Sequence, residues 1–506
     1  MKILLLYPNL YGINTLPPAI GLFTAILKND GHQVRLFDTT VYEGLYNSSD
    51  ADKQKSENLN ARPYDDSLIR QYTKNSDAEN DFLSLVRNYK PDLIAMSATE
   101  DMYSIGVNIL SHLDNHRPPV VAGGVFPTFA PELALKMSNN KIDMLLIGEG
   151  ENTLPELCRK LERGDDISTI DGLCTIKEGK LTQNCLPKPV DLNIYPLPDY
   201  SLFEESRFYR PMQGKLRRML PITTIRGCPF TCGYCNSPSQ RDIYKNSDFD
   251  FFRKKDIEHV YKELKHCLQN YRADSFYFWA DTFLAWNEYE FESFCDMYSE
   301  FKLPFWIQTR PETVTEHRFK RLKEVGLLRV AFGVEHGNEE FRRKVLLRKV
   351  SNNTIIDNLN IVTSLKIPIS VNNILGFPTE TRELAFDTIE LNRHIRSDGI
   401  NAYSYTPFHG TPLRILSEQL GYVNKNSLAT SITNPTMISM PHFTKKDIEG
   451  LRRCFVLYVK MPRHRWKEIE KAESLTPEGD AIWKELKDEC LSKYMHYDDN
   501  EKHDDD

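Results

Sequence analysis

Residues 226–236 read Arg-Gly-Cys-Pro-Phe-Thr-Cys-Gly-Tyr-Cys-Asn, which places Cys228, Cys232 and Cys235 at C-x-x-x-C-x-x-C spacing. The next cysteines along the chain are Cys185 and Cys267. Thiolates are the usual ligands of iron–sulfur clusters, so three of them can hold three irons of a [4Fe–4S] cluster and leave the fourth open. An open iron can bind a substrate, as the unfilled position of a catalytic zinc does.

Two other structures are compatible with cysteines at this spacing. A spacing of four and then three is also that of one face of a buried helix. Gly227 and Pro229 interrupt the run, however, and residues 223–225 before it are typical of a strand, which favours a loop leaving a strand. A zinc site would need a fourth ligand. The nearest side chains of the right kind lie too far along the chain for a standard finger: His259, His266 and Cys267.

The motif resembles that of the radical S-adenosylmethionine (SAM) enzymes. In that family the open iron is chelated by the amino and carboxylate groups of SAM. The aromatic residue before the last cysteine, here Tyr234, packs near the adenine. The resemblance therefore implies two cofactors, a [4Fe–4S] cluster and SAM, and an external electron donor of the flavodoxin or ferredoxin type.

Composition limits the class of protein. At 506 residues the chain predicts about two to four domains. Hydrophobic residues make up 40% and charged residues 27%, and a net charge of -7 with interspersed signs predicts no nucleic-acid binding. No apolar run approaches the roughly 20 residues of a membrane helix, and no signal peptide is expected. The remaining cysteines are scattered singly, which favours a reducing compartment and a cytoplasmic enzyme.

Residues 1–165 alternate strands with helices. We predict strands at 3–6, 34–37, 92–97, 120–122 and 143–147, and helices at 18–29, 102–113, 130–137 and 153–163. This order is typical of an α/β domain with a parallel, doubly wound (Rossmann-like) sheet. Such sheets bind ligands at the carboxyl ends of their strands.

Loops rich in glycine and small polar residues follow three of these strands, and Gly-Gly permits close approach of the backbone to a bulky ligand. In a chain that also carries the cysteine motif, these loops resemble the cobalamin-binding domain of cobalamin-dependent radical SAM enzymes. The resemblance extends over residues 1–415. It implies cobalamin contacts from Ser97, Thr99, Gly123, Gly124, Val125, Pro127, Gly148, Glu149, Gly150 and Glu151.

One motif of many cobalamin proteins is absent from the chain. It is Asp-x-His-x-x-Gly, whose histidine ligates cobalt from below. His32, within Asp30-Gly31-His32, lacks this pattern and is expected to cap the end of the preceding helix. Histidine-off cobalamin is usual for the family, so the resemblance implies a cobalt without a protein histidine and leaves its lower face unassigned.

Residues 216–415 contain six strand-then-helix units. The strands are predicted at 222–225, 275–279, 305–309, 328–333, 369–375 and 402–405. Six units indicate the open (β/α)6 partial barrel that the family resemblance implies, with its chemistry at the carboxyl ends of the strands. Polar groups follow these ends, as in Ala280-Asp281-Thr282 and Gly333-Val334-Glu335.

The same resemblance implies roles at SAM for several of these polar residues. Glu335 matches the glutamate that accepts hydrogen bonds from the ribose hydroxyls, and Asp281 lies where a group near the methionine end is expected. Arg310 and Arg348 are candidates for the SAM carboxylate, and Gln308 is a further candidate contact to SAM. Two structural alternatives stay open: Arg348 in a surface salt bridge, and Gln308 paired with a neighbouring strand loop. His409 stands where relatives often carry another residue.

The other segments have weaker signals. Residues 45–80 are polar and predict a mobile lid or a disordered loop. Residues 166–215 are expected to be a connector with a short strand at 173–176. Residues 416–506 predict a helical domain with helices at 445–460 and 477–494, which could cap the barrel mouth, and an acidic tail at 498–506.

These observations favour an enzyme that uses SAM and cobalamin to methylate an unactivated carbon, or phosphorus, of a small molecule or natural-product intermediate. The alternative is a cyclisation, rearrangement or oxidation with the same cofactors. Methylthiolation of transfer RNA is disfavoured, because those relatives carry three further cysteines in the N-terminal domain and the first cysteine here is Cys158. A cobalamin sensor with a vestigial barrel is disfavoured by the intact cysteine motif.

Overall fold

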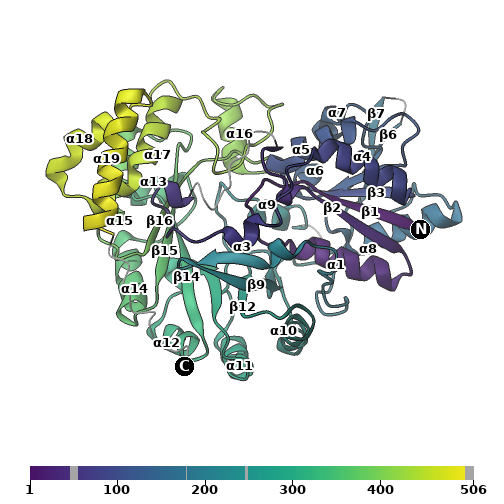
Figure 1. Ribbon diagram of the computed structural model, residues 1–506, viewed down its shortest axis with the longest axis horizontal. Coiled ribbons are helices and arrows are strands. Elements are labelled where there is room, and N and C mark those ends of the chain that lie inside the picture. Colours follow the sequence, from purple (N-terminus) through teal and green to yellow (C-terminus); the bar gives the residue numbers. More distant parts are fainter. Residues whose placement is uncertain (46–54, 178, 246–248, 496–506) are drawn as a thin grey trace.

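The computed structural model describes residues 1–45, 55–177, 179–245 and 249–495, and Figure 1 shows its two sheets side by side. One sheet belongs to the N-terminal part of the chain and the other to the central part, and helices of the C-terminal part lie at the far edge of the second. The predicted acidic tail at 498–506 lies outside the described residues, as does part of the 45–80 insertion.

The N-terminal sheet has the strand order β2-β1-β3-β4-β5-β6-β7. Its first five strands are parallel and follow the 2-1-3-4-5 order of doubly wound, flavodoxin-like folds. The strands are β1 (Lys2–Tyr7), β2 (Gln33–Asp38), β3 (Leu93–Ser97), β4 (Val120–Gly123), β5 (Met144–Leu146), β6 (Leu173–Lys177) and β7 (Lys180–Gln183). The apolar runs of the central strands β1 and β3 are buried on both faces, as a parallel sheet covered by helices requires.

Helices connect these strands and cover both faces of the sheet. They are α1 (Pro18–Asn29), η1 (Thr39–Val41), α3 (Ser67–Arg70), α4 (Ala78–Tyr89), α5 (Glu100–Ser111), α6 (Val125–Phe129), α7 (Pro131–Met137) and α8 (Gly150–Arg163). The helix predicted at 18–29 has the bounds of α1, which begins with Pro18 at its first turn, where a missing N–H costs nothing.

One prediction for the N-terminal half was wrong, and another was confirmed with an added pairing. The described part of the 45–80 insertion is packed against the barrel: Leu59 is buried, and the Asn60 side-chain amide donates to the carbonyl of Ile400 at 2.6 Å. The end of the insertion also begins α4, whose Phe82 is fully buried. The strand predicted in the 166–215 connector is β6, and it pairs antiparallel with β5 and thereby extends the N-terminal sheet.

The second sheet forms the partial barrel, in the order β16-β15-β14-β13-β12-β9-β8. Six strands are parallel, as predicted, and β8 adds an antiparallel strand at one edge. The strands are β8 (Tyr209–Met212), β9 (Lys215–Thr223), β12 (Ser275–Trp279), β13 (Phe305–Thr309), β14 (Leu327–Glu335), β15 (Ile369–Leu375) and β16 (Gly399–Ser404). The elements around them are η3 (Glu205–Phe208), α9 (Asn236–Asp242), α10 (Ile257–Tyr271), α11 (Glu288–Tyr298), η4 (Pro311–Thr313), α12 (Glu316–Glu324), α13 (Glu339–Lys344), α14 (Asn352–Ser364), α15 (Arg382–Arg393) and α16 (Pro412–Gln419).

The first barrel strand lies earlier in the chain than the predicted 222–225. β9 follows β12 in register only to Thr223, which pairs with Trp279. The chain then forms a separate short strand, β10 (Ile225–Arg226), which pairs antiparallel with β11 (Arg253–Lys254). The cysteine loop therefore leaves this two-stranded ribbon above the barrel rather than the barrel strand itself.

The C-terminal helices are α17 (Lys445–Lys460), η5 (Arg463–Arg465), α18 (Trp466–Ala472) and α19 (Pro477–Lys493). Helix α17 packs against α15 and against β16, so these helices cover the open edge of the sheet and not the barrel mouth as predicted (Figure 1). Leu451 and Phe455 of α17 are fully buried in the core that this contact makes. Among the described residues, no helix is both long and apolar enough to cross a bilayer.

Candidate functional site

The three cysteines lie on one loop at the carboxyl end of the barrel, and each sulfur has a polar neighbour. Arg310 donates to Sγ of Cys232 at 3.0 Å, and the Thr282 hydroxyl lies 3.5 Å from Sγ of Cys228. Cys235 precedes α9, and its Sγ accepts from the backbone N–H of Ser237 at 3.4 Å. Donors around sulfur stabilise thiolates, as they do at metal-bound sulfur.

Burial, aided by the neighbouring Asp281 and opposed by the hydrogen bond from the Ser237 N–H, raises the pKa of the Cys235 thiol to about 12. Burial also raises the pKa of the Cys228 thiol. Without a metal these two thiols are therefore neutral, and a metal must displace their protons on binding.

The spacing of the sulfurs does not suit a single zinc ion. Two thiolates on one zinc, each about 2.3 Å from it, lie at most about 4.6 Å apart. In the described part of the chain, only one trio of Cys, His, Asp or Glu has ligand atoms all within 4.8 Å of one another: Glu288, Glu292 and His317. The cysteine sulfurs are spread more widely than that, as ligands of separate irons in one cluster are.

Glu335 ends β14 with a left-handed φ of 71°, and its carboxylate meets a buried arginine. Oε1 of Glu335 accepts from Arg348 at 3.1 Å, and the same guanidinium donates to the Tyr234 hydroxyl at 3.2 Å and to the Gly333 carbonyl at 2.8 Å. Arg348 is 2% exposed, so the alternative of a surface salt bridge is wrong. A Cβ on Gly333 would lie 2.2 Å from Oε1 of Glu335, which explains the glycine.

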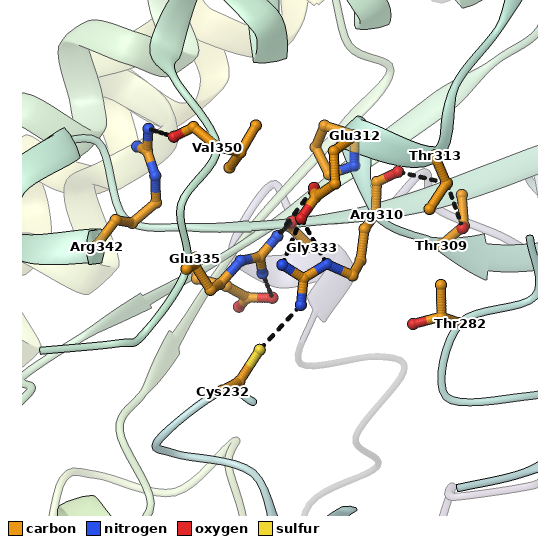
Figure 2. A network of polar contacts seen from close by, with 12 residues as sticks. Cys232, Thr282, Thr309, Arg310, Glu312, Thr313, Gly333, Glu335, Arg342 and Val350 are labelled. Atoms are coloured by element: carbon orange, nitrogen blue, oxygen red, sulfur yellow. Dashed lines mark hydrogen bonds and ion pairs between the residues drawn. The ribbon is translucent and has the colours of Figure 1, made fainter. Parts of the chain in front are cut away.

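Arg310 joins this group to the cysteine loop. Figure 2 shows it between Cys232 and Glu312, and its Nε donates to Oε1 of Glu312 at 2.7 Å. Its guanidinium also stacks on the Phe230 ring, 3.7 Å from the ring centre. Glu312 in turn approaches Arg348 at 3.7 Å, so the two arginines share one carboxylate. Both guanidiniums already donate to protein groups, and neither presents two parallel N–H groups that are free to bind a carboxylate.

Asp281 and Gln308 hold the loops beside the cysteines. The Ser237 hydroxyl donates to Oδ2 of Asp281 at 2.6 Å, while burial raises the pKa of this carboxyl above its ordinary value. Gln308 donates to the carbonyl of Ala280 at 3.4 Å, which is the pairing with a neighbouring strand loop left open above. Asp281 therefore contacts Ser237, the second residue after the third cysteine, and Gln308 supports the loop that carries Asp281.

A cavity of about 410 Å³, here called the glycine cavity, opens at the carboxyl ends of the N-terminal strands. Its walls contain eight of the ten residues predicted to contact cobalamin: Ser97, Gly123, Gly124, Val125, Gly148, Glu149, Gly150 and Glu151. Trp279 and Tyr244 close it from the barrel side. Of the other two residues, Thr99 lines an adjoining cavity, and Pro127 is buried within α6.

That adjoining cavity, of about 420 Å³, is called the bridging cavity because it reaches both domains. It shares Gly124, Val125 and Trp279 with the glycine cavity and extends to Asp281. Since Asp281 contacts the cysteine loop, the bridging cavity connects the N-terminal strand ends to the cysteines. His32 lies at the opposite, amino end of the strands, where it contacts the N-terminal amine at 3.3 Å.

Two of the residues predicted to contact cobalamin use their carboxylates for contacts between domains. Glu149 accepts from Arg226 at 2.8 Å and from Arg253, both on the β10–β11 ribbon, and Glu151 pairs with Arg226 at 2.6 Å. Both carboxylates are buried. Their side chains therefore join the N-terminal domain to the strand that leads into the cysteine loop.

Comparison with protein families gives two matches in the order that the geometry suggests. Residues 67–158 match the B12 binding domain, and residues 222–391 match the radical SAM superfamily. The chain belongs to the radical SAM enzymes that carry a B12-binding domain. In this enzyme the first match covers β3 to β5 and the glycine loops, and the second covers the cysteine loop and most of the barrel.

Named relatives of the enzyme differ in the reaction that they are named for. An uncharacterised methyltransferase of Pyrococcus horikoshii is 28% identical over 407 residues, which are 77% of this chain and 83% of the relative. An anaerobic magnesium-protoporphyrin IX monomethyl ester cyclase of Rubrivivax gelatinosus is 24% identical over 82% of this chain and 75% of the relative. The fold resembles that of the cobalamin-dependent SAM radical enzyme OxsB, with a TM-score of 0.64, 16% identity, and coverage of 96% of this chain and 71% of that one.

The sequence did not reveal the residues of this radical SAM enzyme that hold other site residues in position. Glu312 joins Arg310 to Arg348, and Ser237 holds Asp281. Glu100, which is 4% exposed on α5, accepts from the His409 side chain at 2.6 Å and so ties the N-terminal domain to the barrel. Glu312 lies within Thr309-Arg310-Pro311-Glu312, directly after a barrel strand, so its position in the sequence could have indicated a site residue. Glu100 could not be found in this way, because nothing in the sequence pairs it with a residue 309 positions away.

Proposed function

We propose that this protein is a cobalamin-dependent radical SAM methyltransferase acting on an unactivated carbon, or on phosphorus, of a small molecule or natural-product intermediate. One observation carries the proposal: the bridging cavity connects the glycine loops of the B12-binding domain to Asp281 beside the cysteine loop. A reaction that needs both cofactors needs their sites to face one gap. The methyltransferase relative supports methyl transfer as the outcome.

The cysteine loop fits a [4Fe–4S] cluster with one open iron. Three sulfurs with wide spacing and no zinc geometry supply three ligands, and the hydrogen bond from Arg310 to Cys232 would stabilise negative charge on sulfur. When bound together, the cluster and SAM would supply the radical chemistry, while the protein supplies placement and exclusion of water. Glu335 and Tyr234 would then hold the ribose and adenine of SAM beside the open iron, with Arg348 orienting both.

The glycine cavity fits a large, partly apolar ligand such as cobalamin. Its floor is made of glycines and of apolar residues such as Leu5, Ala95 and Val121, and a side chain on Gly124 would strike the carbonyl of Ala98. Among the described residues, no histidine lines this cavity, whereas His259 lines the bridging cavity. We therefore propose that no protein histidine ligates cobalt when cobalamin is bound. An external flavodoxin or ferredoxin is the expected source of electrons.

A cyclisation or oxidation with the same cofactors is the second candidate, and the resemblance to the monomethyl ester cyclase favours it. SAM labelled with deuterium in its methyl group separates the two candidates. The protein, reconstituted anaerobically with iron, sulfide and cobalamin, is incubated with labelled SAM, a reductant and a metabolite extract. Methyl transfer predicts a product that carries the deuterated methyl group. An unlabelled product formed together with 5′-deoxyadenosine would instead favour the second candidate.

A further inference from the structure

Arg210, on β8, lies flat against aromatic side chains of the barrel. Its guanidinium carbon lies 4.4 Å from the ring centre of Trp306 and 5.3 Å from that of Tyr277. The two rings stack on each other at 4.2 Å. Within the described residues, Arg210 has no carboxylate in ion-pair distance, and its side chain donates no hydrogen bond. A stacked guanidinium keeps its N–H edges available, so Arg210 is positioned to bind a ligand.

Arg210 lines a cavity of about 450 Å³, here called the arginine cavity, at the junction of three parts of the chain. The N-terminal loops contribute Asn14 and Thr99, the barrel contributes Arg210 and Asn236, and the C-terminal segment contributes Thr433. Asn14 is 7% exposed, and its side-chain amide has no hydrogen-bond partner among the described residues. The Asn14 amide and the half-buried Arg210 guanidinium therefore face one cavity with donors that no described protein group uses, and a ligand can accept from both.

The acidic residues of this cavity have partners of their own. Glu100 accepts hydrogen bonds from the His409 side chain at 2.6 Å and from the backbone of Ala429 at 2.8 Å. Asp101 accepts from the Thr99 hydroxyl at 2.6 Å. Lys55 also lines the cavity and has a partner of its own. Among the charged side chains of this lining, Arg210 is therefore the one without a hydrogen bond or ion pair in the described part of the chain.

We infer that the arginine cavity binds the substrate through a carboxylate held by Arg210 and Asn14. The planar guanidinium donates two parallel N–H bonds to a carboxylate, and the Asn14 amide adds a third donor. One unpaired arginine matches the single charge of a carboxylate better than a phosphate group, which carries about -1.5 to -2. This inference rests on the proposed function and names the class of its substrate, a carboxylic acid.

The position of the cavity suits this role. It shares Tyr7, Thr99 and Val125 with the bridging cavity. An acid anchored at Arg210 can therefore extend its carbon skeleton into the gap between the glycine loops and the cysteine loop. The anchor would fix which carbon faces that gap.

Isothermal titration calorimetry tests the inference without turnover. The reconstituted protein, loaded with cobalamin and SAM but given no reductant, is titrated with benzoate, indole-3-acetate and tetradecanoate, and with the methyl ester of each. We expect at least one acid to bind with one-to-one stoichiometry and its ester to bind at least tenfold more weakly. Arg210→Met should weaken binding of that acid by about tenfold to a hundredfold, which is the worth of hydrogen bonds to a charged group.

Control variants separate the loss of the carboxylate contact at Arg210 from misfolding and from failure of the proposed methyl transfer. Arg210→Lys keeps the charge but loses the planar fork, so it should bind the acid between wild type and Arg210→Met. Arg87→Met removes a charge from the exposed face of α4 and should bind the acid as wild type does. Equal binding of acid and ester, no binding of any acid, unchanged binding by Arg210→Met, or tighter binding of phenyl phosphate than of benzoate would each overturn the inference. Binding needs no reaction, so failure of methyl transfer leaves this result intact.

Discussion

Gly333→Ala tests whether the Glu335 carboxylate forms part of the SAM site. The Cβ of an alanine at this position would lie 2.2 Å from Oε1 of Glu335 and 3.6 Å from a terminal nitrogen of Arg348. The carboxylate must move by about 1 Å to reach an ordinary contact distance, and this breaks its 3.1 Å bond to Arg348. A charge-assisted hydrogen bond is worth about 1.5–3 kcal/mol. We therefore expect the dissociation constant of SAM to rise by about tenfold to a hundredfold.

Calorimetry with SAM on the anaerobically reconstituted protein measures this effect, with iron content as the check on the cluster. Glu335→Gln should raise the dissociation constant over the same range, because it keeps the shape of the side chain and removes its charge. Gly164→Ala is the control: it makes the same chemical change at the end of α8, where no atom lies within 4 Å of the added carbon. Because the left-handed φ of 72° strains an alanine at this position, the variant also tests whether a loss of stability alone weakens SAM binding, which we expect to stay unchanged. SAM binding that is unchanged in both Gly333→Ala and Glu335→Gln would show that Glu335 is structural only.

Changing Cys228, Cys232 and Cys235 to alanine should abolish the electron paramagnetic signal of the reduced cluster, and a triple variant that still holds four irons and cleaves SAM would contradict the assignment. Burial raises the pKa of the Glu149 carboxyl, but Arg226 and Arg253 lower it more, so the net pKa lies below its ordinary 4.5. The ion pair therefore stabilises the fold above about pH 4.5, and this stability is lost as pH falls through the folded-state pKa. Breaking a buried pair costs about 3–5 kcal/mol, so Glu149→Gln should melt at a lower temperature than wild type at pH 7. This difference in melting temperature should shrink as the pH falls below about 4.5, and a constant difference would argue against the pair. Cobalamin bound in the cob(II) state should show no superhyperfine splitting from nitrogen, and a splitting would reveal a protein histidine or another nitrogen on cobalt.

Much of the fold could be predicted because its signals are local. The β12, β13 and β15 strands have the predicted bounds. β12 and β13 are short, mostly apolar runs followed by polar loop residues, and β15 is followed by Gly376 and Pro378, which end a strand. Helix α4 was missed because polar residues dominate the stretch before Phe82. The packing of residues 55–66 against the barrel was also missed, because it depends on contacts such as Asn60 with Ile400, 340 positions apart.

In the candidate site, too, the local features could be predicted from the sequence and the long-range contacts could not. The cysteine loop and the glycine loops are contiguous in sequence, so residue type and spacing predicted them. The partners of charged residues are not contiguous: Glu149 meets Arg253 across 104 positions, and Arg348 meets Tyr234 across 114. A motif could therefore indicate that Glu149 and Arg348 matter, but it could not show that each has a protein partner in place of a free edge for a ligand.

The most direct test of the central claim is a count of the two products that SAM gives in one anaerobic incubation. The reconstituted protein is supplied with cobalamin, a reductant, SAM and a substrate acid, and 5′-deoxyadenosine and S-adenosylhomocysteine are measured together. The account predicts that both form, that omitting cobalamin stops S-adenosylhomocysteine, and that the cysteine triple variant stops 5′-deoxyadenosine. Formation of S-adenosylhomocysteine without cobalamin, or of 5′-deoxyadenosine without the three cysteines, would contradict it.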